Sequence, residues 1–123
     1  MLSSAKIIAF VATTDFDRAR SFYEEVLGLK FVKNDGFALV MEANGVPIRI
    51  AKVGKFTPAP FTVLGWQVEE IQKTASLMKK NGVKFERFPG LEQDALGIWS
   101  APGGARVAWF KDLDGNILSV SEH

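Results

Sequence analysis

The chain has 123 residues, of which 47% are hydrophobic and 24% charged, and its formal net charge is +1. This length and composition predict one globular domain, residues 1–123, with a sizeable core. Nucleic acid is not expected as a partner, because phosphate binding needs a concentrated basic face and no Lys/Arg cluster here exceeds two adjacent residues. The absence of cysteine excludes disulfides, thiolate catalysis and thiolate–zinc sites.

The segment near the N-terminus carries no membrane signal. Its longest apolar run, Ile7–Ala12, is followed closely by Asp15. Such a run is too short for a membrane span or for the apolar part of a signal peptide. We therefore expect no membrane partner and a cytoplasmic location.

The first half of the chain predicts a strand, a helix and three further strands. Ile7–Ala12 is apolar on both faces, as in a strand covered on both sides. A helix follows, which Thr14 or Asp15 can cap and Gly28 ends. The three strands are expected at Leu29–Lys33, Phe37–Glu42 and Ile48–Val53, joined by Asn-Asp-Gly and Asn-Gly turns.

The second half predicts the same order after a linker at Lys55–Pro60. It begins with a strand at Phe61–Val68 and continues with a helix that starts near Ile71 and ends at Gly82. Its three further strands are expected at Val83–Phe88, Arg106–Lys111 and Ile117–Ser121, with a longer loop, Pro89–Gly104, between the first two.

A short internal repeat supports this division into halves. The tetrapeptide GLKF at Gly28–Phe31 recurs as GVKF at Gly82–Phe85, 54 positions later, whereas Phe22 and Tyr23 match Leu77 and Met78 at an offset of 55. One residue is therefore missing from the second helix. The repeats span about residues 4–56 and 61–123.

Two segments carry a resemblance to a known family: TTDFDRARSFYEEVLGLKF near the start and WFKDLDGNILSV near the end. The chain resembles the vicinal oxygen chelate superfamily, also described as glyoxalase, bleomycin-resistance and dioxygenase-like proteins. Leu113 stands where the family's turn usually has proline. The resemblance implies an α+β fold in which two βαβββ repeats form an open, cup-shaped curved sheet with helices on the convex side.

The resemblance also implies where a metal would bind. Many family members hold a divalent ion through histidines and glutamates in the middles of the inner strands, and the matching positions here are Ile8, Arg49, Val63 and Ser119. Two of these are hydrocarbon, one is a permanent cation and one is a neutral hydroxyl. The sequence therefore predicts no metal and no cofactor.

Other conceivable ligands do not change that expectation. The single histidine, His123, is the last residue, and chain ends are usually poorly ordered. Asp112 and Asp114 are candidates for a carboxylate site, but aspartates in such a turn usually serve its geometry.

Without metal ligands, the cup would be apolar with a few polar groups, as small-molecule sites are. Strand alternation turns Phe10, Arg49, Gln67 and Ser119 inward. Trp99 and Trp109 could stack on a planar ligand, although core or lid packing is an alternative, and alternation does not settle which face Trp109 occupies. The candidate ligand-binding residues are Phe10, Arg49, Gln67, Trp99, Trp109 and Ser119.

Arg49 has two readings. A guanidinium inside a cup suits a carboxylate or phosphate, so Arg49 is a candidate anchor for an anionic ligand. Alternatively, it lies along the sheet toward solvent or pairs with a carboxylate such as Glu42.

Three functions are compatible with these observations. The first is a metal-free protein that binds an anionic or planar small molecule, resembling the bleomycin-resistance branch. The second is a lyase or isomerase resembling glyoxalases, against which the missing ligands argue. The third is a structural or regulatory dimer whose cup is filled by side chains. A homodimer is expected in each case, because an open curved sheet leaves apolar edges that need cover.

Overall fold

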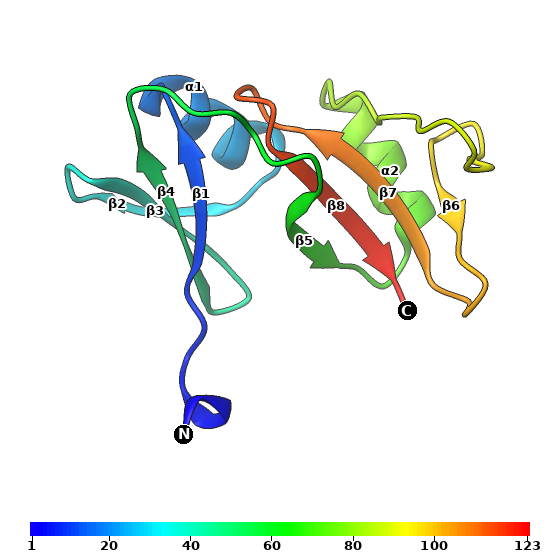
Figure 1. Cartoon of the computed structure of the whole chain (residues 1–123), viewed down its shortest axis with the longest axis horizontal. Helices are drawn as coiled ribbons and strands as arrows, with labels where there is room; N and C mark the ends of the chain where they lie inside the picture. Colours follow the sequence, from blue (N-terminus) through cyan, green and yellow to red (C-terminus); the bar gives the residue numbers. More distant parts are fainter. The chain divides into compact units, whose positions relative to one another are not determined.

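The computed structural model describes residues 1–123, which form two compact units, Met1–Thr57 and Pro58–His123. Each unit contains one four-stranded sheet with helical segments on one face (Figure 1). The α+β fold with two related halves is thus confirmed, and the unit boundary falls inside the expected linker. That the two sheets close into one cup stays a prediction. No helix in the chain combines the length and apolar character needed to cross a membrane.

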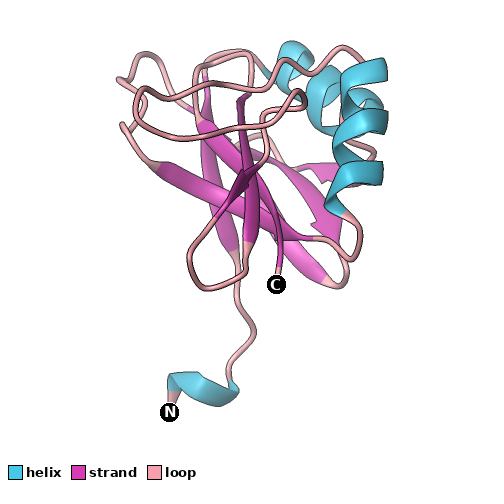
Figure 2. Cartoon of the chain, turned by 90° about the vertical axis from the view of Figure 1, so that its right-hand side faces the viewer, coloured by secondary structure: helices cyan, strands magenta, loops and turns pink.

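Unit 1 contains a sheet with the strand order β1-β4-β3-β2, in which β1 and β4 are parallel and the other pairs antiparallel. Its elements are η1 (Leu2–Ser4), β1 (Ala9–Thr13), α1 (Phe16–Arg20), η2 (Ser21–Val26), β2 (Lys30–Asn34), β3 (Ala38–Ala43) and β4 (Val46–Lys52). Strand β1 begins later than expected, so Ile8 lies before the hydrogen-bonded ladder. Figure 2 shows η1 at the end of an extended segment that leaves this sheet.

The first helix begins as expected and then changes its winding. The Asp15 side chain caps α1 by accepting a hydrogen bond from the Arg18 N–H at 3.2 Å. From Ser21 the helix continues as the π-helix η2, in which the Leu27 N–H donates to the Phe22 carbonyl. A π-helical turn accommodates one extra residue. This explains why the repeat offset changes from 55 to 54 within the helices, since α2 of unit 2 is a regular α-helix.

The core of unit 1 lies between the helix and one face of the sheet. Alternate residues of the strands are buried on that face, and Ala19, Phe22 and Tyr23 cover them from the helix. The strand residues buried on that face are Val11, Thr13, Leu39, Met41, Ile48 and Ile50. The opposite face contains their neighbours in each strand and is the open face of unit 1.

Unit 2 repeats this topology with the strand order β5-β8-β7-β6, in which β5 and β8 are parallel. Its elements are β5 (Thr62–Gln67), α2 (Ile71–Lys80), β6 (Trp99–Ser100), β7 (Arg106–Lys111) and β8 (Ile117–Glu122). The Glu122 carboxylate accepts a hydrogen bond from the Ile71 N–H at 3.0 Å, so the end of β8 caps the first turn of α2. Helix α2 covers one face of the sheet through Ile71, Ala75 and Met78, opposite Ala108, Phe110, Leu118 and Val120.

The predicted strand at Val83–Phe88 is wrong. This segment makes a single bridge, between Phe85 and Phe110, and β6 takes the edge position instead. The physical reason is the carboxamide of Gln93, which accepts a hydrogen bond from the Phe88 N–H at 2.8 Å and donates one to the Glu86 carbonyl at 2.9 Å. One side chain thus satisfies backbone groups that a neighbouring strand would otherwise pair.

Candidate functional site

The open face of unit 1 has apolar side chains next to Arg49 and charged side chains toward β2. Phe10, Arg49 and Val40 are direct neighbours across β1, β4 and β3, so their side chains share this face. Phe10 is 62% exposed. The next row along the strands consists of the small residues Ala12, Ala51 and Ala38.

Arg49 is engaged by a carboxylate within its own unit. Its Nη2 lies 2.9 Å from Oδ2 of Asp35, in the turn between β2 and β3. The other oxygen, Oδ1, accepts hydrogen bonds from the N–H groups of Ala38 and Phe37. From the sequence, Glu42 was the expected carboxylate partner, because the sequence does not show that the turn between β2 and β3 reaches Arg49.

The bonds to Asp35 stabilise its charged form. The N–H groups of Ala38 and Phe37, followed by the Arg49 guanidinium, lower the pKa of Asp35 to about 2 from its ordinary value of 3.8. Asp35 therefore stays negative at neutral pH, and an anionic ligand at Arg49 would have to compete with it.

The open face of unit 2 combines aromatic rings with neutral polar groups. Gly65, Ser119 and Trp109 are direct neighbours across β5, β8 and β7. The adjacent row contains Gln67, Ser121, Val107 and Trp99. This pairing places Trp109 on the same face as Ser119, which settles a question that strand alternation left open.

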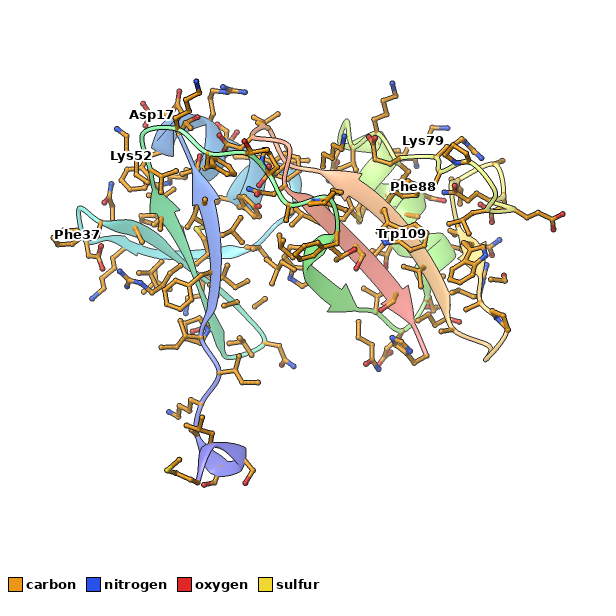
Figure 3. The ribbon with its side chains drawn as sticks, viewed as in Figure 1. Asp17, Phe37, Lys52, Lys79, Phe88 and Trp109 are labelled. Atoms are coloured by element: carbon orange, nitrogen blue, oxygen red, sulfur yellow. The ribbon has the colours of Figure 1, made fainter.

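The aromatic residues on this face form a cluster that we call the Trp99–Trp109 cluster, consisting of Phe88, Trp99 and Trp109. The two indole rings lie 6.0 Å apart at an interplanar angle of 33°, and the Phe88 ring meets Trp109 edge-on at 5.4 Å. Figure 3 shows Phe88 and Trp109 next to each other beside β7. All three residues are half-buried, so each ring keeps part of its surface open to a ligand.

One strand position on the open face of unit 2 has no side chain, namely Gly65 of β5. A Cβ atom built on Gly65 would lie 2.7 Å from the Ser119 Oγ, closer than real side chains approach. The Ser119 hydroxyl therefore lies in the space that a side chain at position 65 would fill, and the Gly65 backbone itself is exposed. Further along β8, the Ser121 Oγ lies 3.0 Å from Nε2 of His123, which adds an imidazole to the polar groups of this face.

The loop that supports Trp99 is held by its own polar side chains. Arg87 donates hydrogen bonds to the carbonyls of Gln93, Asp94 and Ala95. The Asp94 carboxylate accepts from the N–H groups of Leu96 and Ile98. The roles of Arg87 and Gln93 were missed from the sequence, since nothing in the sequence distinguishes these residues from solvated loop residues.

The four positions that match the family's metal ligands differ in their surroundings. Ile8 is half exposed before β1, and Val63 lies where the pairing of β5 with β8 shifts register, between Thr62 and Leu64. Arg49 pairs with Asp35, and Ser119 packs over Gly65. No group of three or more His, Cys, Asp or Glu side chains gathers anywhere in the chain.

The aspartates of the turn between β7 and β8 have a structural role. The buried carboxylate of Asp112 accepts hydrogen bonds from the N–H groups of Asp114 and Asn116 and from the Asn116 side chain at 2.8 Å. This agrees with the expectation that these aspartates serve turn geometry.

The candidate residues from the sequence therefore fall into two groups. Gln67, Trp99, Trp109 and Ser119 share the open face of unit 2, whereas Phe10 and Arg49 share the open face of unit 1. The first group has neutral polar atoms next to indole rings, and the second has a neutralised cation next to an exposed phenyl ring.

Comparison with known proteins agrees with the fold. The family described as "Glyoxalase/Bleomycin resistance protein/Dioxygenase superfamily" matches residues 6–120. A glyoxalase family protein from Bacillus anthracis is similar in structure, with a TM-score of 0.79 and 17% identity over 98% of this chain and 95% of that chain. A superfamily member from Sphaerobacter thermophilus has a TM-score of 0.74 and 19% identity over 100% of both chains.

A third similar structure is a lactoylglutathione lyase from Agrobacterium tumefaciens, with a TM-score of 0.73 and 18% identity over 97% of this chain and 93% of that chain. At these identities the likeness shows the fold alone. No curated protein matches the sequence.

Proposed function

The chain belongs to the glyoxalase/bleomycin resistance protein/dioxygenase superfamily, and we propose that within it the protein binds a planar small molecule and needs no metal ion. The observation that carries this proposal is the Trp99–Trp109 cluster. Trp109 is the direct neighbour of Ser119 in the sheet, and Gln67 lies on the same open face.

The chemistry of this face suits a flat ring with a polar edge. A planar ligand stacked on an indole ring gains roughly 0.5–1.5 kcal/mol beyond the area it buries. The Ser119 hydroxyl and the Gln67 carboxamide can each donate and accept hydrogen bonds. Apolar surface with a few convergent polar groups is the usual composition of a small-molecule site.

Metal independence is supported by the residues at the ligand positions. Hydrocarbon side chains at Ile8 and Val63 have no donor atom, and the Arg49 guanidinium repels a divalent cation. Ser119 alone offers an oxygen, which as a neutral hydroxyl is a poor ligand for such ions. This donor set favours binding over metal-assisted lyase or isomerase chemistry.

We further propose that the protein acts as a homodimer in the cytoplasm. Large apolar side chains are exposed in the first strand of each unit and just before it: Ile8 and Phe10 in unit 1, and Phe61 and Val63 in unit 2. Exposed apolar surface along unpaired strand edges favours association. Light scattering at about 100 μM, well above common dimer dissociation constants, should show the mass of two chains, and a monomer at that concentration would contradict the proposal.

The binding proposal is tested with two matched probes, 2-naphthalenemethanol and 2-naphthalenesulfonate, which share a ring system and differ in charge. Ligand-observed NMR should detect binding of the neutral probe to the wild-type protein. Replacing either indole by Leu should weaken binding about 2- to 13-fold, the equivalent of roughly 0.5–1.5 kcal/mol of stacking.

Phe37→Leu is the control variant, because Phe37 is an exposed aromatic residue of unit 1 outside the cluster. This variant should bind the neutral probe as the wild type does. If Trp99→Leu and Trp109→Leu also leave the affinity unchanged, the cluster is packing only and the proposal fails.

A further inference from the structure

The outer side of α2 carries a groove that the proposed function does not use. It has a volume of about 480 Å³ and is lined by Gln72, Lys73, Ser76, Leu77, Lys80 and Leu96. We call it the α2 groove. Leu77 lies in it with 61% of its surface exposed, although it is adjacent in sequence to the buried Met78. Successive helical residues point about 100° apart, so Leu77 cannot share the face of α2 that packs on the sheet.

The wall of the groove opposite the helix is fixed in place. Leu96 belongs to the loop that Arg87, Gln93 and Asp94 hold with their side chains, and its own N–H donates to Asp94 Oδ1 at 2.9 Å. Next to it, Gly97 has a φ of +91°, and a Cβ there would lie 2.9 Å from the Phe85 Cβ. Only glycine fits this close approach of the loop to the segment that follows α2. The groove is therefore formed before any partner arrives.

The charges that line the groove are all positive. Lys73 and Lys80 are separated by two turns of helix, about 10.5 Å along the axis, with Leu77 between them. Lys73 also contacts Glu70 at 3.4 Å, but both side chains are more than two-thirds exposed, and such pairs contribute little. No acidic residue lines the groove. It complements two negative charges on either side of an apolar group.

The equivalent helix of unit 1 shows that the fold does not require this arrangement. The position that matches Leu77 in the repeat is Phe22, which is only 7% exposed. At the same offset, Lys80 is matched by Glu25. One repeat therefore buries this apolar side chain beside an acidic residue, and the other exposes it between two lysines.

We propose that the α2 groove binds an acidic amphipathic helix of another protein. Aliphatic side chains of that helix would pack on Leu77 and Leu96, and carboxylates seven residues apart would meet Lys73 and Lys80. Recognition of a helix in an apolar groove uses residues spaced i, i+3, i+4 and i+7, which match the spacing of the lysines around Leu77. A second copy of this chain does not fit, because its helix α1 with η2 buries Phe22 and Tyr23 and pairs Glu24 with Arg20.

The test uses a synthetic helical peptide with Glu at positions i and i+7 and Leu at i+3 and i+4, labelled with fluorescein. Anisotropy titration should show binding to the wild-type protein, and the binding should weaken as salt increases. The double variant Lys73→Glu/Lys80→Glu should bind the peptide about tenfold more weakly or worse. The same variant should bind a peptide with Lys in place of both Glu residues, which restores opposite charges.

The matched control is Lys79→Glu/Lys84→Glu, which changes the net charge by the same amount at exposed lysines outside the groove. Figure 3 shows Lys79 at the end of α2. This control should bind the Glu peptide nearly as tightly as the wild type does. Leu77→Asn, at an exposed position that does not affect the core, should weaken binding without changing the circular dichroism spectrum.

Two results would overturn the proposal. The first is no binding of the Glu peptide to the wild-type protein at concentrations up to about 1 mM. The second is equal loss of binding in both double variants, which would mean that the peptide responds to net charge and not to the groove.

Discussion

Replacing Gln93 should lower the stability of unit 2 and hold Trp99 less firmly, because its carboxamide forms hydrogen bonds to three backbone groups. It accepts a hydrogen bond from the Phe88 N–H and donates to the carbonyls of Glu86 and Gly97, at 2.8–2.9 Å. A bridge also pairs Gln93 with Trp99. Each intramolecular hydrogen bond contributes about 0.5–1.5 kcal/mol net. Since the site is only partly buried and water replaces some bonds, we expect Gln93→Leu to lower the free energy of unfolding by about 2 kcal/mol.

Urea denaturation, monitored by tryptophan fluorescence, measures this loss of stability in unit 2. The three tryptophans, Trp66, Trp99 and Trp109, all belong to unit 2. With an m value of about 1.5 kcal/mol/M, a loss of about 2 kcal/mol lowers the midpoint by about 1.3 M urea. A second reading by circular dichroism checks that both probes report one transition.

The variant Gln93→Glu distinguishes hydrogen bonding from packing. A glutamate has nearly the same shape and can still accept from the Phe88 N–H, but its second oxygen would face the two carbonyls that the amide now serves. We expect a loss at least as large as that of Gln93→Leu, and weaker binding of 2-naphthalenemethanol in both variants. A change below about 0.5 kcal/mol in both would refute the reasoning, because that is the range of ordinary surface substitutions.

Three further predictions concern the open faces and the metal. Asp35→Asn should strengthen binding of 2-naphthalenesulfonate if that probe binds at Arg49. The double variant Asp35→Asn/Arg49→Ala should lose this gain, at a cost of roughly 1.5–3 kcal/mol of probe binding. Calorimetry on both variants checks this. Because the pKa of Asp35 is lowered to about 2, the stability that its charge contributes is complete above pH 3.8 and is lost as the pH falls toward 2. Between these pH values, the free energy of unfolding of Asp35→Asn should therefore depend less on pH than that of the wild type. Protein purified without an affinity tag and dialysed should carry well under one equivalent of Zn, Ni, Mn, Fe or Co by elemental analysis. Adding these ions should not raise its melting temperature, since an ion that binds only the folded state must stabilise it. A stoichiometric metal whose removal lowers the melting temperature would make glyoxalase-like catalysis the better proposal.

Local sequence signals determined most of the elements of this protein. Glycines 28 and 82 ended the helices, Asn-Gly and Asp-Gly-Asn turns separated the strands, and alternation identified which residues share a face. These features depend on a residue and its near neighbours in the chain, so they can be read without the fold. The repeat offset even located the extra residue of the first helix, although its π-helical form became visible only in the structure.

Tertiary structure decided which side chains meet. Alternation could not assign Trp109 to a face, and the pairing of β7 with β8 did so by placing it beside Ser119. The partner of Arg49 is Asp35, since the turn between β2 and β3 reaches the open face. The segment 83–88 has the composition of a strand, but a side chain ten residues from its start, Gln93, satisfies its backbone groups. Register and long-range hydrogen bonds depend on the whole sheet, because a shift of one residue turns every side chain to the other face.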